Sequence, residues 1–256
     1  MAEAALAPSL VRERDRLDLG YTEADAAALN AELSDLDTHA FLDAILSEIA
    51  AGELAVVSSF GAESAVLLDL VAAVDPGLPV LFLETGKHFP ETLAYRDELI
   101  RRLGLTDVRS LTPDPADLAA KDDKGLRWSY DPDGCCELRK VKPLERAMKE
   151  FRGSITGRKA FQNDLRSKLP RVEAENGRLK INPIIHWSAG DIAAHFEARN
   201  LPRHPLEAEG YPSIGCAPCT SKVRPGEDPR SGRWRGWDKT ECGIHVDGEA
   251  SELPTF

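Results

Sequence analysis

The beginning of the 256-residue sequence lacks a long apolar stretch behind a basic front. A secretory signal peptide or a membrane-spanning helix would need such a stretch. We therefore expect a cytoplasmic protein without membrane contact, and structural disulfides are rare in that compartment.

Positive charge is also scarce, because 32 Lys and Arg face 43 Asp and Glu, which gives a net charge of −11. Proteins that bind nucleic acid or anionic membranes broadly are usually basic, so we expect neither partner. Between Lys222 and Lys239, however, six basic residues accompany three acidic ones. This local pattern fits either a site for a small anionic ligand or a solvated charged loop.

Short apolar runs alternate with helical patterns along most of the chain. Near-continuous apolar strands alternating with helices predict an α/β fold, with a parallel sheet and helices on both faces. From residue 204 onward Gly and Pro are frequent, which predicts a loop-rich C-terminal segment. The expected strands are 54–58, 79–83, 107–110, 154–156 and 179–181, and the expected helices are 37–50, 64–71, 90–103, 137–151 and 188–198.

The segment from Ser58 to Ser64 follows the first expected strand and opens a helix. Ligands of open parallel sheets bind beyond the carboxyl ends of the strands. Serine hydroxyls and free N–H groups at a helix start can hold phosphate there, although a plain strand-to-helix turn has the same pattern. The ATPase loop G-x-x-x-x-G-K-[ST] is absent, which disfavours a standard P-loop enzyme. Lys87 and His88, after the second strand, would face the same crevice.

Cysteine is sparse but clustered. Cys135 and Cys136 are adjacent, and Cys216 and Cys219 have the C-x-x-C spacing of metal ligands. Four cysteines can bind zinc or an iron–sulfur cluster. Adjacent ligands are unusual for zinc, whereas each iron of a cubane needs one thiolate, so the pattern favours a cluster. Zinc and unliganded buried cysteines remain alternatives.

The fifth cysteine, Cys242, has no partner at metal-ligand spacing. A thiolate near cations is a good nucleophile, and the basic run before Cys242 supplies the cations. His245 is a candidate base or hydrogen-bond partner. The alternative is a buried, inert cysteine.

Together these segments resemble the phosphoadenylyl/adenylyl-sulfate reductases of assimilatory sulfate reduction, over about residues 50–245. The matching segments are SSFGAES (58–64), LETGKHFPET (83–92), CCELRKVKPL (135–144), NPIIHW (182–187), GYPSIGCAPCT (210–220), GRW (232–234) and ECGIH (241–245). The resemblance implies a Rossmann-like sheet of the adenine-nucleotide alpha-hydrolase type. It divides the chain into an N-terminal extension (1–36), expected to be mobile, one nucleotide-binding reductase domain with a C-terminal catalytic tail (37–245), and an acidic tail (246–256).

The resemblance also implies roles for individual residues. A 4Fe-4S cluster would be bound by Cys135, Cys136, Cys216 and Cys219. Lys140 would lie between cluster and substrate, with Lys87 and His245 in support. The substrate would be bound by Ser58, Ser59, Phe60, Gly61, Glu84, Thr85, Gly86, Lys140, Arg158, Arg166 and Arg233.

The implied reaction is reduction of adenosine 5′-phosphosulfate to sulfite and AMP. Cys242 would become a cysteine S-sulfonate, and thioredoxin or a similar dithiol would release sulfite. The family also implies a homo-oligomer. Three alternatives stay open: a phosphoadenylyl-sulfate reductase, an ATP-cleaving adenylyl transferase of related fold, and a zinc-stabilised binding module.

Overall fold

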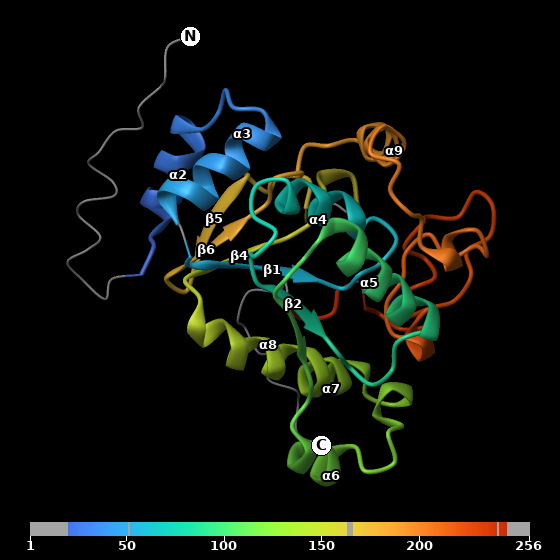
Figure 1. The fold of residues 1–256 in the computed structure, drawn as a ribbon. Helices are drawn as coiled ribbons and strands as arrows, with labels where there is room; N and C mark the ends of the chain where they lie inside the picture. Colours follow the sequence, from blue (N-terminus) through green and yellow to red (C-terminus); the bar gives the residue numbers. More distant parts are fainter. Residues whose placement is uncertain (1–19, 51, 163–165, 240, 245–256) are drawn as a thin grey trace.

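A mostly parallel sheet organises the computed structural model, which describes residues 20–50, 52–162, 166–239 and 241–244 (Figure 1). Six strands form the sheet in this part of the chain, in the order β3-β2-β1-β4-β6-β5. All neighbouring pairs are parallel except β5 and β6 at one edge. The strands are β1 (Leu54–Ser58), β2 (Val80–Leu83), β3 (Val108–Leu111), β4 (Gly153–Ile155), β5 (Val172–Glu175) and β6 (Arg178–Ile181).

Helices lie on both faces of the sheet, as the sequence predicts (Figure 1). The α-helices of the described chain are α2 (Glu23–Glu32), α3 (Thr38–Asp43), α4 (Ser64–Ala72), α5 (Pro90–Leu103), α6 (Pro115–Lys121), α7 (Pro132–Cys136), α8 (Lys142–Ala147) and α9 (Ala189–Ala198). Two π-helical turns extend α3 and α7, namely η2 (Ala44–Ile49) and η4 (Glu137–Val141). Short 3-10 turns occupy η3 (Arg127–Ser129), η5 (Met148–Glu150), η6 (Ala160–Gln162), η7 (Pro205–Glu207) and η8 (Ala217–Cys219).

Side-chain alternation along β1 divides the core between the two faces. Leu54 and Val56 join the large apolar cluster that α2, α3, α4, α5 and α9 also enter. Ala55, between them, points to the other face and joins a smaller cluster with Phe151 and side chains of α8. Successive strand residues point to opposite faces, so one buried strand serves both layers.

The helix boundaries follow recognisable end signals. Pro90 begins α5 at a position that needs no N–H donor, and Gly104 ends it in the left-handed region with φ of 67°. Ser188 and Asp191 form a reciprocal capping box at the start of α9. The predicted ranges for β1 and α5 are therefore confirmed to the residue.

The edge strand β5 was missed by the sequence analysis. It joins β6 through Asn176 and Gly177, which both have positive φ, and Glu175 pairs with Arg178. An Asn-Gly pair is the usual signal of a two-residue hairpin, so the sequence contained the information. The expected all-parallel sheet thus has one antiparallel edge.

The described part of the N-terminal extension, residues 20–36, contains α2, which packs against β5. Leu29 and Leu33 are each 1% exposed in the main core. Among the described residues, no helix is long and apolar enough to cross a membrane.

His204 fixes the beginning of the C-terminal loops to α5. Its Nδ1 accepts a hydrogen bond from the Leu206 N–H at 3.2 Å, so Nε2 carries the proton and donates to Thr92 Oγ1 at 3.1 Å. The side chain is 1% exposed, and burial lowers the pKa of His204 to about 4.

We predict that this histidine makes stability depend on pH below neutrality. The unfolded imidazole binds a proton near pH 6.5, whereas the folded one does so only near pH 4. The unfolded state therefore binds more protons in this window, and stability falls as the pH drops from about 6.5 to 4. Urea unfolding at pH 7.5 and pH 5 should show a smaller pH effect in His204→Gln than in the wild type. Equal pH effects on the stability of both proteins would contradict this role of His204.

Candidate active site

The predicted phosphate turn follows β1 and is shaped by an unusual backbone conformation. Phe60 is fully buried against Phe82 and has φ of 48°, in the left-handed region. Its N–H donates to Ser58 Oγ at 3.2 Å, while Ser59 is exposed. The residue before α4, Glu63, makes no side-chain cap. The turn thus presents Ser59 at the carboxyl edge of the sheet, with an uncapped helix start behind it.

The second predicted segment, after β2, is tied to the C-x-x-C loop. Glu84 accepts a hydrogen bond from the Gly86 N–H at 2.9 Å, which closes the turn. Thr85 is fully buried and its hydroxyl lies 3.3 Å from Cys216 Sγ. The Lys87 carbonyl accepts from the N–H of Ala217 at 2.8 Å, and the Lys87 ammonium donates to a backbone carbonyl, that of Gly125, at 2.5 Å.

A buried ion pair links this turn to the first cysteine pair. Arg139 on η4 pairs with Asp122 at 2.6 Å, with side-chain exposures of 9% and 1%. The same guanidinium donates to the Thr85 carbonyl at 2.7 Å. Since η4 continues α7, this contact fixes the helix of Cys135 and Cys136 against the end of β2.

Four of the cysteines gather where α7 meets η8. Cys135 and Cys136 end α7 and are buried, as is Cys216, while Cys219 is partly buried. Burial raises the pKa of Cys136 to about 11 and also raises the pKa of Cys135 and of Cys219. The sulfur atoms are close enough to influence one another electrostatically. The two predicted pairs therefore meet in space.

The chemistry of these four donors fits an iron–sulfur cluster. They are thiols only, and a hydroxyl (Thr85) and two cations (Arg139 and Lys140) lie close by. Such groups stabilise thiolate and sulfide charge. Within the described ranges, no three His, Cys, Asp or Glu side chains form a ready site for a single metal ion.

Two predicted substrate cations lie beside the sulfur atoms. Although burial opposes it, the sulfur atoms of Cys216, Cys242 and Cys136 raise the pKa of Lys140. Burial lowers the pKa of Arg233, and the sulfur atom of Cys242 opposes that effect.

Arg233 can lie in this place only because residue 215 is glycine. A Cβ at Gly215 would overlap the guanidinium group. Arg233 Nη1 donates to the Ile214 carbonyl at 3.3 Å. Its Nε is closed to solvent and has no hydrogen-bond partner among the described residues. An anion could use that donor, because a buried N–H without a partner costs free energy.

The segment of Cys242 is fixed on both sides of the cysteine. Lys239 forms an ion pair with Asp133 at the start of α7. Gly243 lies against η4, since a Cβ there would meet Val141 Cγ2 at 3.4 Å. Cys242 is partly exposed and close enough to act electrostatically on Lys140 and Arg233. The predicted partner His245 lies outside the described residues.

The two remaining predicted arginines are held by carboxylates. Arg158 is 4% exposed, pairs with Glu173 on β5, and donates to Asn182 Oδ1 at 3.0 Å. Arg166 pairs with Glu241 at 2.7 Å. Arg166 thereby lies next to the residue before the predicted nucleophile, whereas Arg158 is turned toward the sheet edge.

Sequence reasoning missed several charged residues at this edge. Lys159 is 3% exposed and pairs with Glu63 of the phosphate turn at 2.6 Å. Glu241 pairs with Arg230 at 3.6 Å in addition to Arg166. Both acids belong to matching motifs, but neither motif indicates which distant cation each acid meets.

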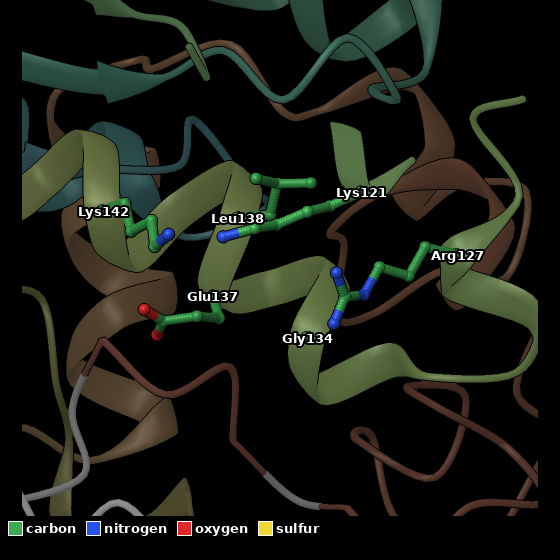
Figure 2. Close-up of a pocket in the computed structure, with 6 residues that line it drawn as sticks. All are labelled: Lys121, Arg127, Gly134, Glu137, Leu138 and Lys142. Carbon is green, nitrogen blue, oxygen red and sulfur yellow. The ribbon is translucent and has the colours of Figure 1, made fainter. Parts of the chain in front are cut away.

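A hollow elsewhere on the surface does not coincide with this site. Its lining side chains come from α6, η3, α7, η4 and α8 (Figure 2). None of its lining residues was predicted to bind substrate or cluster. They are Lys121, Arg127, Gly134, Glu137, Leu138 and Lys142.

Comparison with known proteins identifies the family. The profile of the phosphoadenosine phosphosulfate reductase domain matches residues 53–222. The chain belongs to this family. This match confirms the family that the sequence motifs predict.

The relatives that match most of the chain are named either adenosine 5′-phosphosulfate reductase or phosphoadenosine 5′-phosphosulfate reductase. The chain is 49% identical to an adenosine 5′-phosphosulfate reductase of Mesorhizobium japonicum, covering 88% of this chain and 89% of the relative. It is 44% identical to one of Mycolicibacterium smegmatis, covering 72% and 79%. It is 41% identical to a phosphoadenosine 5′-phosphosulfate reductase of Gloeobacter violaceus, covering 80% and 88%.

Solved structures confirm the predicted fold. A phosphoadenylyl-sulfate reductase from Candida auris, in a phosphate complex, superposes with a TM-score of 0.65 at 25% identity, covering 80% of this chain and 99% of that one. An FMN adenylyltransferase from Candida glabrata has a TM-score of 0.51 at 16% identity, covering 82% and 69%. The latter likeness concerns the fold alone.

We predict that Asp122→Asn destabilises the protein by about 3–5 kcal/mol, because it leaves the buried Arg139 guanidinium without its counter-charge. Urea unfolding followed by circular dichroism measures the loss. The matched control is Asp107→Asn, which breaks an ion pair to Arg109 whose side chains are 34% and 39% exposed. That change should cost less than about 1 kcal/mol. Similar losses in both variants would refute the structural role given to Asp122.

Proposed function

We propose that the protein reduces adenosine 5′-phosphosulfate to sulfite and AMP, with Cys242 as the nucleophile. The observation that carries the proposal is the position of Cys242 close to two cations, Lys140 and Arg233, and to Cys136 of the first cysteine pair. Family membership and the names of the relatives with 49% and 44% identity support the same reaction.

In the first step, the Cys242 thiolate attacks the sulfur atom of the substrate's sulfate group. A sulfur–sulfur bond forms, the bond between that sulfur and the bridging oxygen breaks, and AMP leaves with the electron pair. Cys242 becomes an S-sulfonate. Lys140 and Arg233 neutralise charge where the thiolate and the anionic group meet, and AMP is a stable leaving group, so positioning and charge neutralisation are the main tasks of the protein.

In the second step, a dithiol such as thioredoxin supplies two electrons. One thiolate attacks Cys242 Sγ, the sulfur–sulfur bond breaks, and sulfite leaves. The second thiol of the donor then attacks the mixed disulfide, which frees Cys242 as a thiolate and leaves the donor as a disulfide. The potential of thioredoxin, about −270 mV, suits such exchange. The partial exposure of Cys242 would allow a protein donor to approach.

The four clustered thiols are the ligands that we assign to a 4Fe-4S cluster. When bound, such a cluster adds a fixed negative field beside Lys140 and need not change oxidation state. Thr85 would donate its hydroxyl to Cys216 Sγ, 3.3 Å away. Lys140 would then balance ligand and substrate charge at once.

Adenosine 5′-phosphosulfate is the preferred substrate in this proposal. The presence of both cysteine pairs supports it, because family members that use phosphoadenylyl sulfate commonly lack them. The Gloeobacter relative, named for the phosphorylated substrate at 41% identity, supports the second candidate. The two substrates differ by one phosphate group, so a parallel assay separates them.

We predict that protein purified without oxygen contains about four irons and four sulfides per chain. It should form sulfite from adenosine 5′-phosphosulfate with thioredoxin as donor, and more slowly from the phosphorylated substrate. Iron and sulfide analysis and a sulfite assay with both nucleotides are the measurements. Zinc in place of iron would refute the cluster, and preference for the phosphorylated nucleotide would favour the second candidate.

We predict that Cys242→Ser lowers sulfite formation at least about 1,000-fold, because a serine hydroxyl cannot form the S-sulfonate. Iron and sulfide should remain at the wild-type level. The matched variant Cys216→Ser should lose cluster iron while keeping the nucleophile. Mass spectrometry of wild type mixed with substrate and no donor should show sulfonate on Cys242. Normal turnover by Cys242→Ser would rule out this nucleophile.

A further inference from the structure

Glu241, the residue before Cys242, reaches across to a distant part of the chain. Its Oε1 lies 2.7 Å from Nη2 of Arg166, and its Oε2 lies 3.6 Å from Nη2 of Arg230. The Arg166 and Glu241 side chains are each 10% exposed, so water screens this ion pair weakly. The contact joins positions 75 residues apart and fixes the backbone beside the nucleophile.

The cations that meet Glu241 belong to a larger group. Arg166 and Arg230 both lower the pKa of Lys159, and Arg230 lowers the pKa of Arg166, so the three cations lie near one another. Burial lowers the pKa of Lys159 and of Arg166, and a carboxylate opposes the effect in each case, Glu63 for Lys159 and Glu241 for Arg166.

Two carboxylates thus lie among these three cations, close to the predicted phosphate turn. Glu63 belongs to the phosphate turn and Glu241 to the segment of the nucleophile. Guanidinium groups bind sulfate and phosphate oxygens as readily as carboxylate oxygens. An anion that enters this group of cations must therefore share or replace the carboxylate contacts.

We propose that Glu241 is a positioning residue that docks the Cys242 segment onto Arg166 and Arg230, and that an anionic group of the substrate competes with its carboxylate for these two arginines. The identity of the competing anion rests on the function proposed above. The docking contact itself does not.

This competition ties substrate binding to movement of the nucleophile. When the anion takes the guanidinium groups, the Glu241 carboxylate is released and the Cys242 segment can shift toward the sulfur atom. When AMP leaves, the carboxylate rebinds. Because coupling is reciprocal, a docked Glu241 must weaken anion binding by the same factor by which the anion weakens docking. Removing the carboxylate charge should therefore tighten anion binding and slow the release of AMP, because no carboxylate then competes for the two arginines.

Glu241→Gln tests the docking contact without substrate. The C-terminal tryptic peptide that follows Lys239 contains Cys242 as its one cysteine, so mass spectrometry can follow alkylation of this thiol by iodoacetamide. We expect alkylation about fivefold faster in Glu241→Gln than in the wild type. Glu227→Gln is the matched control, because Glu227 pairs with the exposed Arg235 in the same loop-rich region. It should react at the wild-type rate.

Inorganic sulfate and AMP are the anion probes. Each should speed alkylation of wild-type Cys242 relative to sodium chloride of equal ionic strength, and should have less effect on Glu241→Gln. Calorimetry should show AMP binding three- to tenfold tighter in Glu241→Gln, while kcat for sulfite formation falls. Glu241→Asp, which keeps the charge, should return AMP affinity toward the wild-type value.

Unchanged alkylation in Glu241→Gln, or an equal increase in Glu227→Gln, would overturn the docking contact. Unchanged or weaker AMP binding in Glu241→Gln would overturn the competition, since loss of a purely structural contact would not tighten binding. If wild-type protein reduced neither sulfonucleotide, the proposed function would fall. The docking contact would then still be judged by the alkylation measurements alone.

Discussion

Asp122 and Arg139 form an ion pair that is almost closed to solvent, and the same guanidinium donates to the carbonyl of Thr85. This pair joins three parts of the chain that are far apart in sequence. Arg139 follows the first cysteine pair, Thr85 lies in the turn after β2, and the Thr85 hydroxyl lies 3.3 Å from Cys216 Sγ of the second pair. The pair therefore helps to fix the first cysteine pair and Cys216 relative to each other, which is why we predict the larger stability loss for Asp122→Asn.

Charge compensation governs the rest of the carboxyl edge. Lys140 and Arg233 lie beside sulfur atoms that can carry negative charge, and Lys159 and Arg166 lie beside carboxylates. A buried cation without a partner would be strongly destabilising. The cysteine sulfur atoms stabilise Lys140 and Arg233, and the carboxylates stabilise Lys159 and Arg166. The folded protein can therefore hold these four cations close together without a bound anion.

The sequence predicted this fold well where the signals are local. The apolar run of β1 and the proline and glycine at the ends of α5 gave their ranges directly. The antiparallel β5 was missed because its residues have little apolar character, although Asn176 and Gly177 marked the hairpin. Alternation of strands and helices indicates parallel pairing, but it does not show where one strand is added at an edge in the opposite direction.

The candidate site was predictable in its residue types and only partly in its contacts. Cysteine spacing and the family motifs indicated which thiols meet. The partners of Arg139, Lys159 and Arg166 lie 17, 96 and 75 positions away, respectively, and no local pattern links them. Such ion pairs depend on tertiary packing. A sequence motif can therefore predict that an arginine belongs to a site, but it does not show which carboxylate pairs with that arginine.

The C-terminal segment is attached to the sheet mainly through polar contacts, and this bears on how Cys242 can work. Among the described residues, Leu206 and Ile214 of this segment pack on Ala62 in a small buried apolar cluster. Other attachments are hydrogen bonds of His204 and ion pairs of Lys239 and Glu241. Segments with few buried apolar contacts open at lower free energy than the core.

In the proposed reaction, Cys242 must meet a small nucleotide first and a protein dithiol afterwards. An anion can displace the carboxylate of an ion pair, so attachment by ion pairs would let Cys242 move between the nucleotide and the dithiol. Attachment by buried apolar contacts would keep Cys242 in one position.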